Sequence, residues 1–192
     1  VVERCRFEGG GVFGGPKGTI RNCIFNGPHS WVGNGIGDNY LEVSNCRFNV
    51  TEHTPISSRA DTNIITNNII RVDGTNIQAG ISLAVGQVYD YVANNLVVIR
   101  GPVYGMETAP QNEGLSIVNN TVDTLYRWQF EAWYGILVSR DSVSATLANN
   151  TITGGEIAGI GSYGIDKTIY ASYNNLWGNS QDFSVPPSSH VD

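Results

Sequence analysis

Apolar and polar positions follow a six-residue pattern that returns along the whole chain. Its clearest copy runs from Leu147 to Ile152 and reads apolar, any residue, Asn, Asn, any residue, apolar. Further copies with both asparagines begin at Ile65, Val92, Ile117 and Ser172. Toward the N-terminus cysteine takes the second Asn position, in copies that begin at Ile20 and Val43, and the copy at Val2 has a cysteine but no asparagine.

The step between equivalent positions ranges from 18 residues (Cys5 to Cys23) to 30 residues (Asn120 to Asn150). A repeat with a period of roughly 20–50 residues is typical of solenoids, propellers and arrays. β-Branched runs lie before and after the Asn pair, as at 89–92 and 96–99, and no window keeps a helical period. The pattern therefore predicts strands on both sides of a repeated bend.

Asparagine suits such a bend because it tolerates the left-handed backbone conformation. Stacked amide side chains can also hydrogen-bond to one another along the axis, so a buried polar column satisfies itself. We therefore expect one buried ladder, with one residue from each rung. Its expected members are Cys5, Cys23, Cys46, Asn68, Asn95, Asn120, Asn150 and Asn175.

A second phrase, glycine followed by an apolar residue, recurs about half a turn later and predicts a third strand. It occurs at Gly35-Ile36, Gly80-Ile81, Gly105-Met106, Gly135-Ile136 and Gly159-Ile160. The prediction is an all-β fold, a parallel β-helix of about eight rungs with three strands each, over residues 1–183. Residues 184–192 are expected to form a polar tail or cap. A sandwich of short strands is the alternative, but it has no reason to repeat Asn-Asn in every rung.

With its Asn-Asn bends, Gly-Ile phrases and the ending Asn174 to Asn179, the chain resembles the right-handed parallel β-helix of the pectin-lyase-like superfamily. The resemblance covers nearly the whole chain and implies a right-handed coil. It also implies that substrate lies along the strand that starts at the Gly phrase. It names no single activity, because this fold hosts lyases, hydrolases, esterases, phage tailspikes and adhesins.

The formal net charge of -6 argues against a nucleic-acid partner, since little in the chain would neutralise a phosphate backbone. No apolar run approaches the length of a membrane span, so we expect no membrane insertion. The three cysteines are expected to be buried free thiols, because a linear column cannot surround a tetrahedral zinc. His29, His53 and His190 are taken to lie far apart in sequence and rung, so no metal ligand is expected among them. No cofactor is indicated, and calcium stays an option.

Candidate catalytic residues come from the outward positions of the third strand. Glu107 faces outward there, and Arg59 is expected two rungs away, roughly 10 Å at about 4.8 Å per rung. Asp141 on the next rung could pair with Glu107 as the two carboxylates of a glycoside hydrolase. Arg59 and Arg140 could supply the cations that a polysaccharide lyase needs. The alternative is that each of these is a solvated surface charge.

Aromatic residues on the same flank suggest a sugar-binding surface, since aromatic faces stack on sugar rings. The richest stretch is the insertion at 126–134. The candidates are Trp31, Tyr104, Trp128, Trp133 and Tyr163. The alternative is a small hydrophobic core under a long loop.

These observations favour a secreted or cell-surface β-helix protein that binds polysaccharide along one face, with cleavage by lyase or hydrolase chemistry as its enzymatic version. The alternative is a non-catalytic structural or adhesive module of a larger surface protein or assembly. The first rung begins directly in a strand, at Val1 to Phe7, with no segment to cover its edge. We therefore expect self-association or an upstream domain at that rung.

Overall fold

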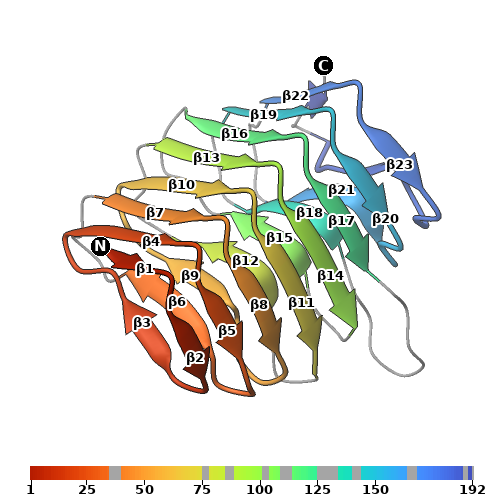
Figure 1. Ribbon diagram of the computed structural model, residues 1–192. Coiled ribbons are helices and arrows are strands. Elements are labelled where there is room, and N and C mark those ends of the chain that lie inside the picture. Colours follow the sequence, from red (N-terminus) through yellow and green to blue (C-terminus); the bar gives the residue numbers. More distant parts are fainter. Residues whose placement is uncertain are drawn as a thin grey trace.

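In the computed structural model, the chain coils through three parallel β-sheets that run along a common axis (Figure 1). The structure describes residues 1–34, 40–74, 78–84, 89–100, 104–108, 114–124, 134–139, 144–163, 168–187 and 190–191. In these ranges the regular elements are strands, and there is no helix. The predicted all-β parallel β-helix with three strands per turn is confirmed.

The sheets contain nine, eight and eight strands, and we name them A, B and C. Sheet A consists of β1 (Val2–Glu3), β4 (Lys17–Arg21), β7 (Tyr40–Ser44), β10 (Thr62–Thr66), β13 (Tyr89–Ala93), β16 (Leu115–Val118), β19 (Ser144–Ala148), β22 (Thr168–Ser172) and β25 (His190–Val191). Sheet B consists of β2 (Arg6–Glu8), β5 (Ile24–Asn26), β8 (Arg47–Val50), β11 (Ile69–Asp73), β14 (Leu96–Arg100), β17 (Thr121–Thr124), β20 (Thr151–Thr153) and β23 (Asn175–Trp177). Sheet C consists of β3 (Gly11–Phe13), β6 (Trp31–Asn34), β9 (Ile56–Ser58), β12 (Ala79–Leu83), β15 (Tyr104–Thr108), β18 (Tyr134–Ser139), β21 (Ala158–Tyr163) and β24 (Phe183–Ser184).

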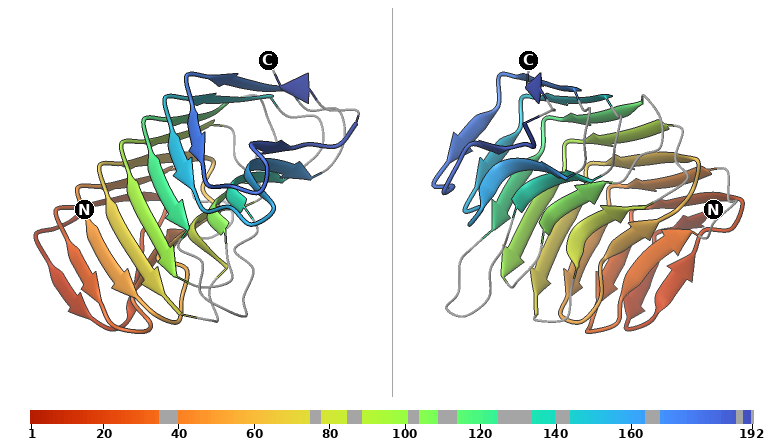
Figure 2. Two further views of the ribbon diagram at one scale, coloured as in Figure 1. Left: turned by 90° about the vertical axis from the view of Figure 1, so that its right-hand side faces the viewer. Right: turned by 180° about the vertical axis from the view of Figure 1, so that it is seen from behind.

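Each turn of the coil passes from sheet A to B to C, and successive turns stack along the axis (Figure 2). Six turns, from β4 to β21, have three strands of at least three residues. The turns at the two ends each include a strand of only two residues, β1 and β24. The expected eight rungs are therefore six full turns between two shortened ones. Beyond them, β25 pairs with β22 and extends sheet A.

The bend from sheet A to sheet B has the predicted left-handed residue. Asparagine holds this position with φ between 54° and 58° at Asn22, Asn45, Asn67, Asn94, Asn119 and Asn149. Arg4 and Tyr173 hold it in the first and last turns, with φ of 56° and 55°. The first residue of each Asn pair thus makes the bend, which leaves the second free to point into the core.

The second residue of the pair forms the predicted ladder. Both the backbone N–H and the side-chain amide of Asn68 donate to Oδ1 of Asn95, each at 3.0 Å. Asn95 repeats both bonds to Asn120, and Asn120 repeats them to Asn150. At the N-terminal side the ladder continues into sulfur, because the backbone N–H of Cys23 donates to Sγ of Cys46 at 3.4 Å.

The ladder ends at Asn174, so the expected member Asn175 was wrong by one position. The side-chain amide of Asn150 donates to Oδ1 of Asn174 at 3.0 Å, whereas Asn175 already lies in β23 and pairs with Thr151. The reason is visible in the apolar flanks, since Leu176 is the register partner of Ile152. Alignment on the apolar positions, rather than on the Asn pair, places Tyr173 at the bend.

The cysteines differ in exposure. Cys23 and Cys46 are buried free thiols as expected, but Cys5 is exposed, which corrects that part of the prediction. Cys5 lies in the first turn, where the described chain provides a neighbouring rung on one side only. Burial raises the pKa of the Cys46 thiol to about 12, so Cys46 is a weak nucleophile.

We expect a water-soluble aromatic disulfide reagent to titrate one thiol quickly in the native protein and all three after unfolding. Cys5 supplies the fast thiol, because reactivity requires both access and the thiolate form. The Cys5→Ser variant should show no fast phase. Fast release of more than one equivalent from the native protein would contradict the burial of Cys23 and Cys46.

The core is a column of apolar side chains between the three sheets, and its aromatic part is a stack of Phe7, Phe25 and Phe48 at centroid spacings of 4.7 Å. Val2 and Phe7, in the first turn, are half-buried against this core. Whether a partner covers that turn remains a prediction. None of the described segments is a helix long and apolar enough to cross a membrane.

Glycine is required where sheet C begins. A Cβ added to Gly135 would lie 2.1 Å from Cγ2 of Ile152 in sheet B, and one added to Gly105 would lie 2.2 Å from Cγ1 of Val122. Both glycines therefore face the core, and the buried Met106 and Ile136 follow them inward. The residue before each glycine, Tyr104 or Tyr134, belongs to a separate apolar cluster outside the main core.

Candidate functional site

Three tyrosines and a glutamate gather on the outer side of sheet C, and we call this group the tyrosine face: Tyr104, Glu107, Tyr134 and Tyr163. They lie on the consecutive strands β15, β18 and β21. The ring centroids of Tyr104 and Tyr134 are 6.2 Å apart, and those of Tyr134 and Tyr163 are 5.6 Å apart in an edge-on arrangement. The three rings form one aromatic cluster across three rungs, with Tyr134 in its middle.

The backbone of sheet C positions these rings. The inward glycines described above leave Tyr104 and Tyr134 on the outside. A Cβ added to Gly161 would lie 2.2 Å from the Tyr134 ring, so that ring rests directly on the backbone of β21. Tyr134 is consequently 4% exposed, whereas Tyr163 is 42% exposed. Tyr134 thus supports the face, and Tyr163 presents its ring to solvent.

Glu107 is half-buried beside the rings and accepts a hydrogen bond of 2.6 Å from the side-chain amide of Gln78. Burial raises the pKa of the Glu107 carboxyl, and the bond from Gln78 partly offsets this shift. Burial and then the charge of Glu107 raise the pKa of Tyr104. Burial and the hydrogen bond with Tyr134 raise the pKa of Tyr163. The phenols of Tyr104 and Tyr163 are therefore neutral near pH 7, and the face offers hydroxyls together with a carboxyl.

The sequence-based candidates divide into three groups. Glu107, Tyr104 and Tyr163 are brought together on the tyrosine face. Arg59 and Trp31 lie on the same sheet but elsewhere. The candidates Asp141, Arg140, Trp128 and Trp133 lie outside the described residues.

From β9 onward the register confirms the outward column that placed Glu107, since Ser57, Ser82, Glu107, Leu137 and Gly161 are successive partners. In the preceding rung the expected strand start at Gly35-Ile36 is wrong, because Gly33 of β6 pairs with Ser57. Arg59 follows β9, two strands from Glu107, and is exposed. Trp31 begins β6, three strands from Tyr104, and packs edge-on against Phe13 at 5.3 Å. Tyr134 was missed, although Tyr-Gly recurs in two consecutive rungs as a signal.

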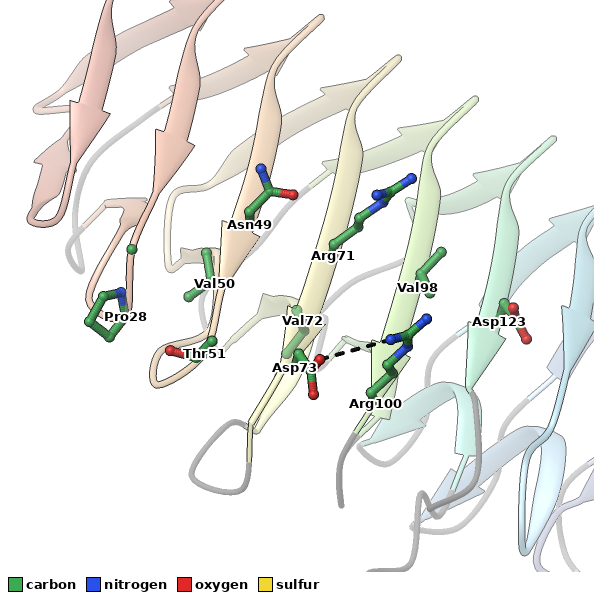
Figure 3. A pocket seen from close by; sticks show the side chains of 11 residues that line it. Pro28, Asn49, Val50, Thr51, Arg71, Val72, Asp73, Val98, Arg100 and Asp123 are labelled. Carbon is green, nitrogen blue, oxygen red and sulfur yellow. Dashed lines mark ion pairs between the residues drawn. The ribbon is translucent and has the colours of Figure 1, made fainter.

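A second concave surface lies on the outer side of sheet B, and we call it the sheet-B groove (Figure 3). It has a volume of about 650 Å³. Its lining residues are Gly27, Pro28, Asn49, Val50, Thr51, Arg71, Val72, Asp73, Val98, Arg100 and Asp123. Sequence reasoning missed it, because candidates were sought only on the strand that follows the Gly phrase.

Charges of both signs line the groove. Arg100 and Asp73 form an ion pair at 4.0 Å, drawn as the dashed line in Figure 3. Oδ1 of Asp123 accepts a hydrogen bond of 2.7 Å from the hydroxyl of Thr153. Arg71 is exposed and has no ion pair or side-chain hydrogen bond with any other described residue. The groove therefore combines a guanidinium that has no partner among the described residues with a positioned carboxylate.

The expectation that His29 and His53 lie on distant rungs was wrong, because they are neighbours. Their ring centroids are 5.0 Å apart, and Nε2 of His29 lies 3.2 Å from Oε2 of Glu52. The loops between sheets B and C bring them together, since 24 residues span one turn of the coil. In the described part of the chain, no group of three or more His, Cys, Asp or Glu could hold a metal ion. A calcium site stays a prediction.

Comparison of the chain with models of protein families, with curated proteins and with solved structures gave no match. The two surfaces themselves therefore indicate the function.

Proposed function

We propose that the protein is a polysaccharide-binding β-helix and that the tyrosine face is its sugar-contacting surface. The observation that carries this proposal is the cluster of Tyr104, Tyr134 and Tyr163 on consecutive strands, with the half-buried Glu107 on the same strand as Tyr104. Sugar rings combine apolar C–H faces with hydroxyls, so they suit aromatic rings that lie beside hydrogen-bonding groups. The parallel strands repeat this chemistry at about 4.8 Å per rung, which favours a ligand that is itself a chain.

Binding, rather than cleavage, is the activity that the described residues support. Glu107 is the single carboxylate of the tyrosine face, whereas hydrolysis of a glycosidic bond ordinarily uses two carboxylates. A cleaving enzyme would need a second acid or base from the chain beyond the described residues, where Asp141 and Arg140 lie. The proposal includes a secreted or cell-surface location, because the polysaccharides that such a protein would bind are extracellular. It also includes a relationship to the pectin-lyase-like superfamily, which the repeat of this chain resembles.

The double variant Tyr104→Ala/Tyr163→Ala should bind oligosaccharides about tenfold to a hundredfold more weakly. Each aromatic ring contributes roughly 0.5–1.5 kcal/mol beyond the area it buries, and 1.4 kcal/mol corresponds to tenfold in affinity. Isothermal titration against a panel of neutral and acidic oligosaccharides measures the change. The matched control is Tyr170→Ala, because Tyr170 lies on β22 in sheet A and is 50% exposed. Unchanged affinity in the double variant would refute the proposal.

Glu107→Gln separates binding from chemistry. The amide keeps the size of the carboxyl but cannot donate or accept a catalytic proton. In a purely binding protein, affinity should fall by about tenfold to a hundredfold, the value of one charge-assisted hydrogen bond of roughly 1.5–3 kcal/mol. Release of reducing or unsaturated sugar ends by the wild type, abolished in Glu107→Gln, would instead show cleavage at this face.

The second candidate function is a structural or adhesive module. An exposed aromatic pair on sheet C favours it, since Phe13 is 66% exposed and packs edge-on against Trp31. A protein of this kind would bind no member of the oligosaccharide panel. It would instead show concentration-dependent association in light scattering.

A further inference from the structure

The sheet-B groove is a second binding surface, on a different sheet from the tyrosine face. We propose that it binds an acidic saccharide, with Arg71 as the residue that recognises the anionic substituent. The proposal goes beyond the function proposed above, because it concerns other residues and can stand or fall separately.

The floor of the groove is one outward column of sheet B. Asn49, Arg71, Val98 and Asp123 are successive register partners on β8, β11, β14 and β17. Three steps of about 4.8 Å make this row roughly 14 Å long. Figure 3 shows the four side chains side by side on neighbouring strands, facing the same space. A ligand in the groove therefore runs along the solenoid axis and crosses the strands.

Arg71 is the available cation of this row. Its register partners Asn49 and Val98 are uncharged, while the nearby Asp73 pairs with Arg100. No described residue makes an ion pair or a hydrogen bond with the Arg71 side chain. A guanidinium presents its donors in a planar fork that fits a carboxylate or sulfate in two parallel bonds. An anion bound by Arg71 thus breaks no interaction between described residues.

The rest of the floor suits a hydroxylated ring. The half-buried side chain of Val98 provides an apolar surface on β14. It lies between Arg71 on β11 and Asp123 on β17. Thr153 holds Asp123 in place through one carboxylate oxygen, at 2.7 Å. On the far side of Arg71, the side-chain amide of Asn49 donates to Oδ1 of Asn26 at 2.8 Å and is likewise oriented. An anionic group, an apolar face and hydroxyls together describe a sugar that carries a carboxylate or sulfate.

Because the net charge of the chain is -6, the guanidinium of Arg71 matters for binding an anionic ligand. Long-range attraction cannot bring a polyanion to the protein, so binding must come from contacts in the groove. We therefore expect modest salt dependence, of the order of one ion pair per bound anionic group. A polyanion held by general surface charge would show a much steeper dependence.

The experiment titrates the full chain and its variants with three oligosaccharides of equal length: one with uronates, one with sulfates and one that is neutral. The fourth probe is the small anion alone, acetate or sulfate. Arg71→Ala should weaken binding of the acidic oligosaccharide at least tenfold, and Arg71→Lys should recover only part of the loss. The matched control is Arg47→Ala, since Arg47 lies on the same sheet in the adjacent outward column, beside Ile69, and does not line the groove. Circular dichroism and thermal melting check that each variant is folded.

The uronate and sulfate probes decide which anion the groove takes. Binding by either that depends on Arg71 but not Arg47 supports the proposal. Equal losses in both arginine variants would show general charge attraction and overturn it, as would wild-type affinity in Arg71→Ala. A loss in Tyr104→Ala/Tyr163→Ala with no loss in Arg71→Ala removes the groove and keeps the tyrosine face. The reverse result removes the tyrosine face and keeps the groove.

Discussion

Replacement of Asn120 by Leu is expected to lower the free energy of unfolding by about 4 kcal/mol. The loss has this size because one side chain serves several buried groups at the centre of the ladder. The substitution leaves the backbone N–H of Asn95 without an acceptor, which costs about 1–3 kcal/mol. It also removes hydrogen bonds to the Asn95 side chain and to the Val92 carbonyl, worth about 1 kcal/mol each.

The hydrogen bonds identify the three groups. Oδ1 of Asn120 accepts from the backbone N–H and from the side-chain amide of Asn95, both at 3.0 Å. The side-chain amide of Asn120 donates to the carbonyl of Val92 at 2.9 Å. Leucine offers none of these partners, and all the groups are inside the coil, where water cannot replace them.

Chemical denaturation monitored by circular dichroism measures the effect, and Asn119→Gly is the matched control. Asn119 precedes Asn120 in the same bend, is exposed and has φ of 55°, a conformation that glycine adopts without strain. The control should change stability by less than about 1 kcal/mol. Similar losses in the two variants would mean that bend conformation, rather than the ladder, stabilises the coil.

The repeat predicts the fold well because each rung buries its apolar face against its neighbours. A side chain that points inward must match the rung above and below, so the pattern records the ladder, the bend and the core-facing glycines. The error at Asn175 arose where two asparagines remained but the apolar flanks had shifted by one. The exposed Cys5 has a similar cause, since a ladder position is buried only between two rungs.

The outward side chains are not constrained in this way, and most of the candidate sites escaped prediction for that reason. Glu107 was placed correctly because strand alternation determines its direction. Tyr134 was missed because the inward Gly135 interrupts that alternation. The proximity of His29 and His53 was missed although the 24 residues between them match one turn of the repeat. The sheet-B groove requires the register of four strands, which only the structure supplies.

The second large effect concerns Asp90, a carboxyl in the core of sheet A. Asp90 is 1% exposed in β13, and its register partners are Asn63 and Leu115. Oδ1 accepts a hydrogen bond of 2.8 Å from the side-chain amide of Asn63, while Oδ2 is buried without a hydrogen-bond partner among the described residues. Burial raises the pKa of Asp90 from its ordinary 3.8 to about 7, although the bond from Asn63 lowers it.

A raised pKa makes the folded protein most stable where the carboxyl is protonated in both states. Below about pH 4 this condition holds. Between pH 4 and pH 7 the unfolded chain loses the proton while the folded chain keeps it, so the free energy of unfolding falls as pH rises. A shift of roughly three units, at 1.36 kcal/mol per unit, corresponds to about 4 kcal/mol. Above about pH 7 both states are ionised, and this contribution no longer changes.

Asp90→Asn should remove this dependence, because the amide stays neutral at every pH and its oxygen can still accept from Asn63. Urea denaturation at half-unit steps from pH 4 to pH 8 measures the difference between variant and wild type, which cancels the titration of all other groups. The difference should grow in favour of Asp90→Asn by about 4 kcal/mol between pH 4 and pH 7 and then level off. Asp73→Asn is the control, since it makes the same exchange at an exposed carboxylate beside Arg100, where an ion pair contributes little to stability. A flat difference curve for Asp90→Asn would show that Asp90 is ionised in the folded protein, with a cation or a polar group outside the described residues holding its charge.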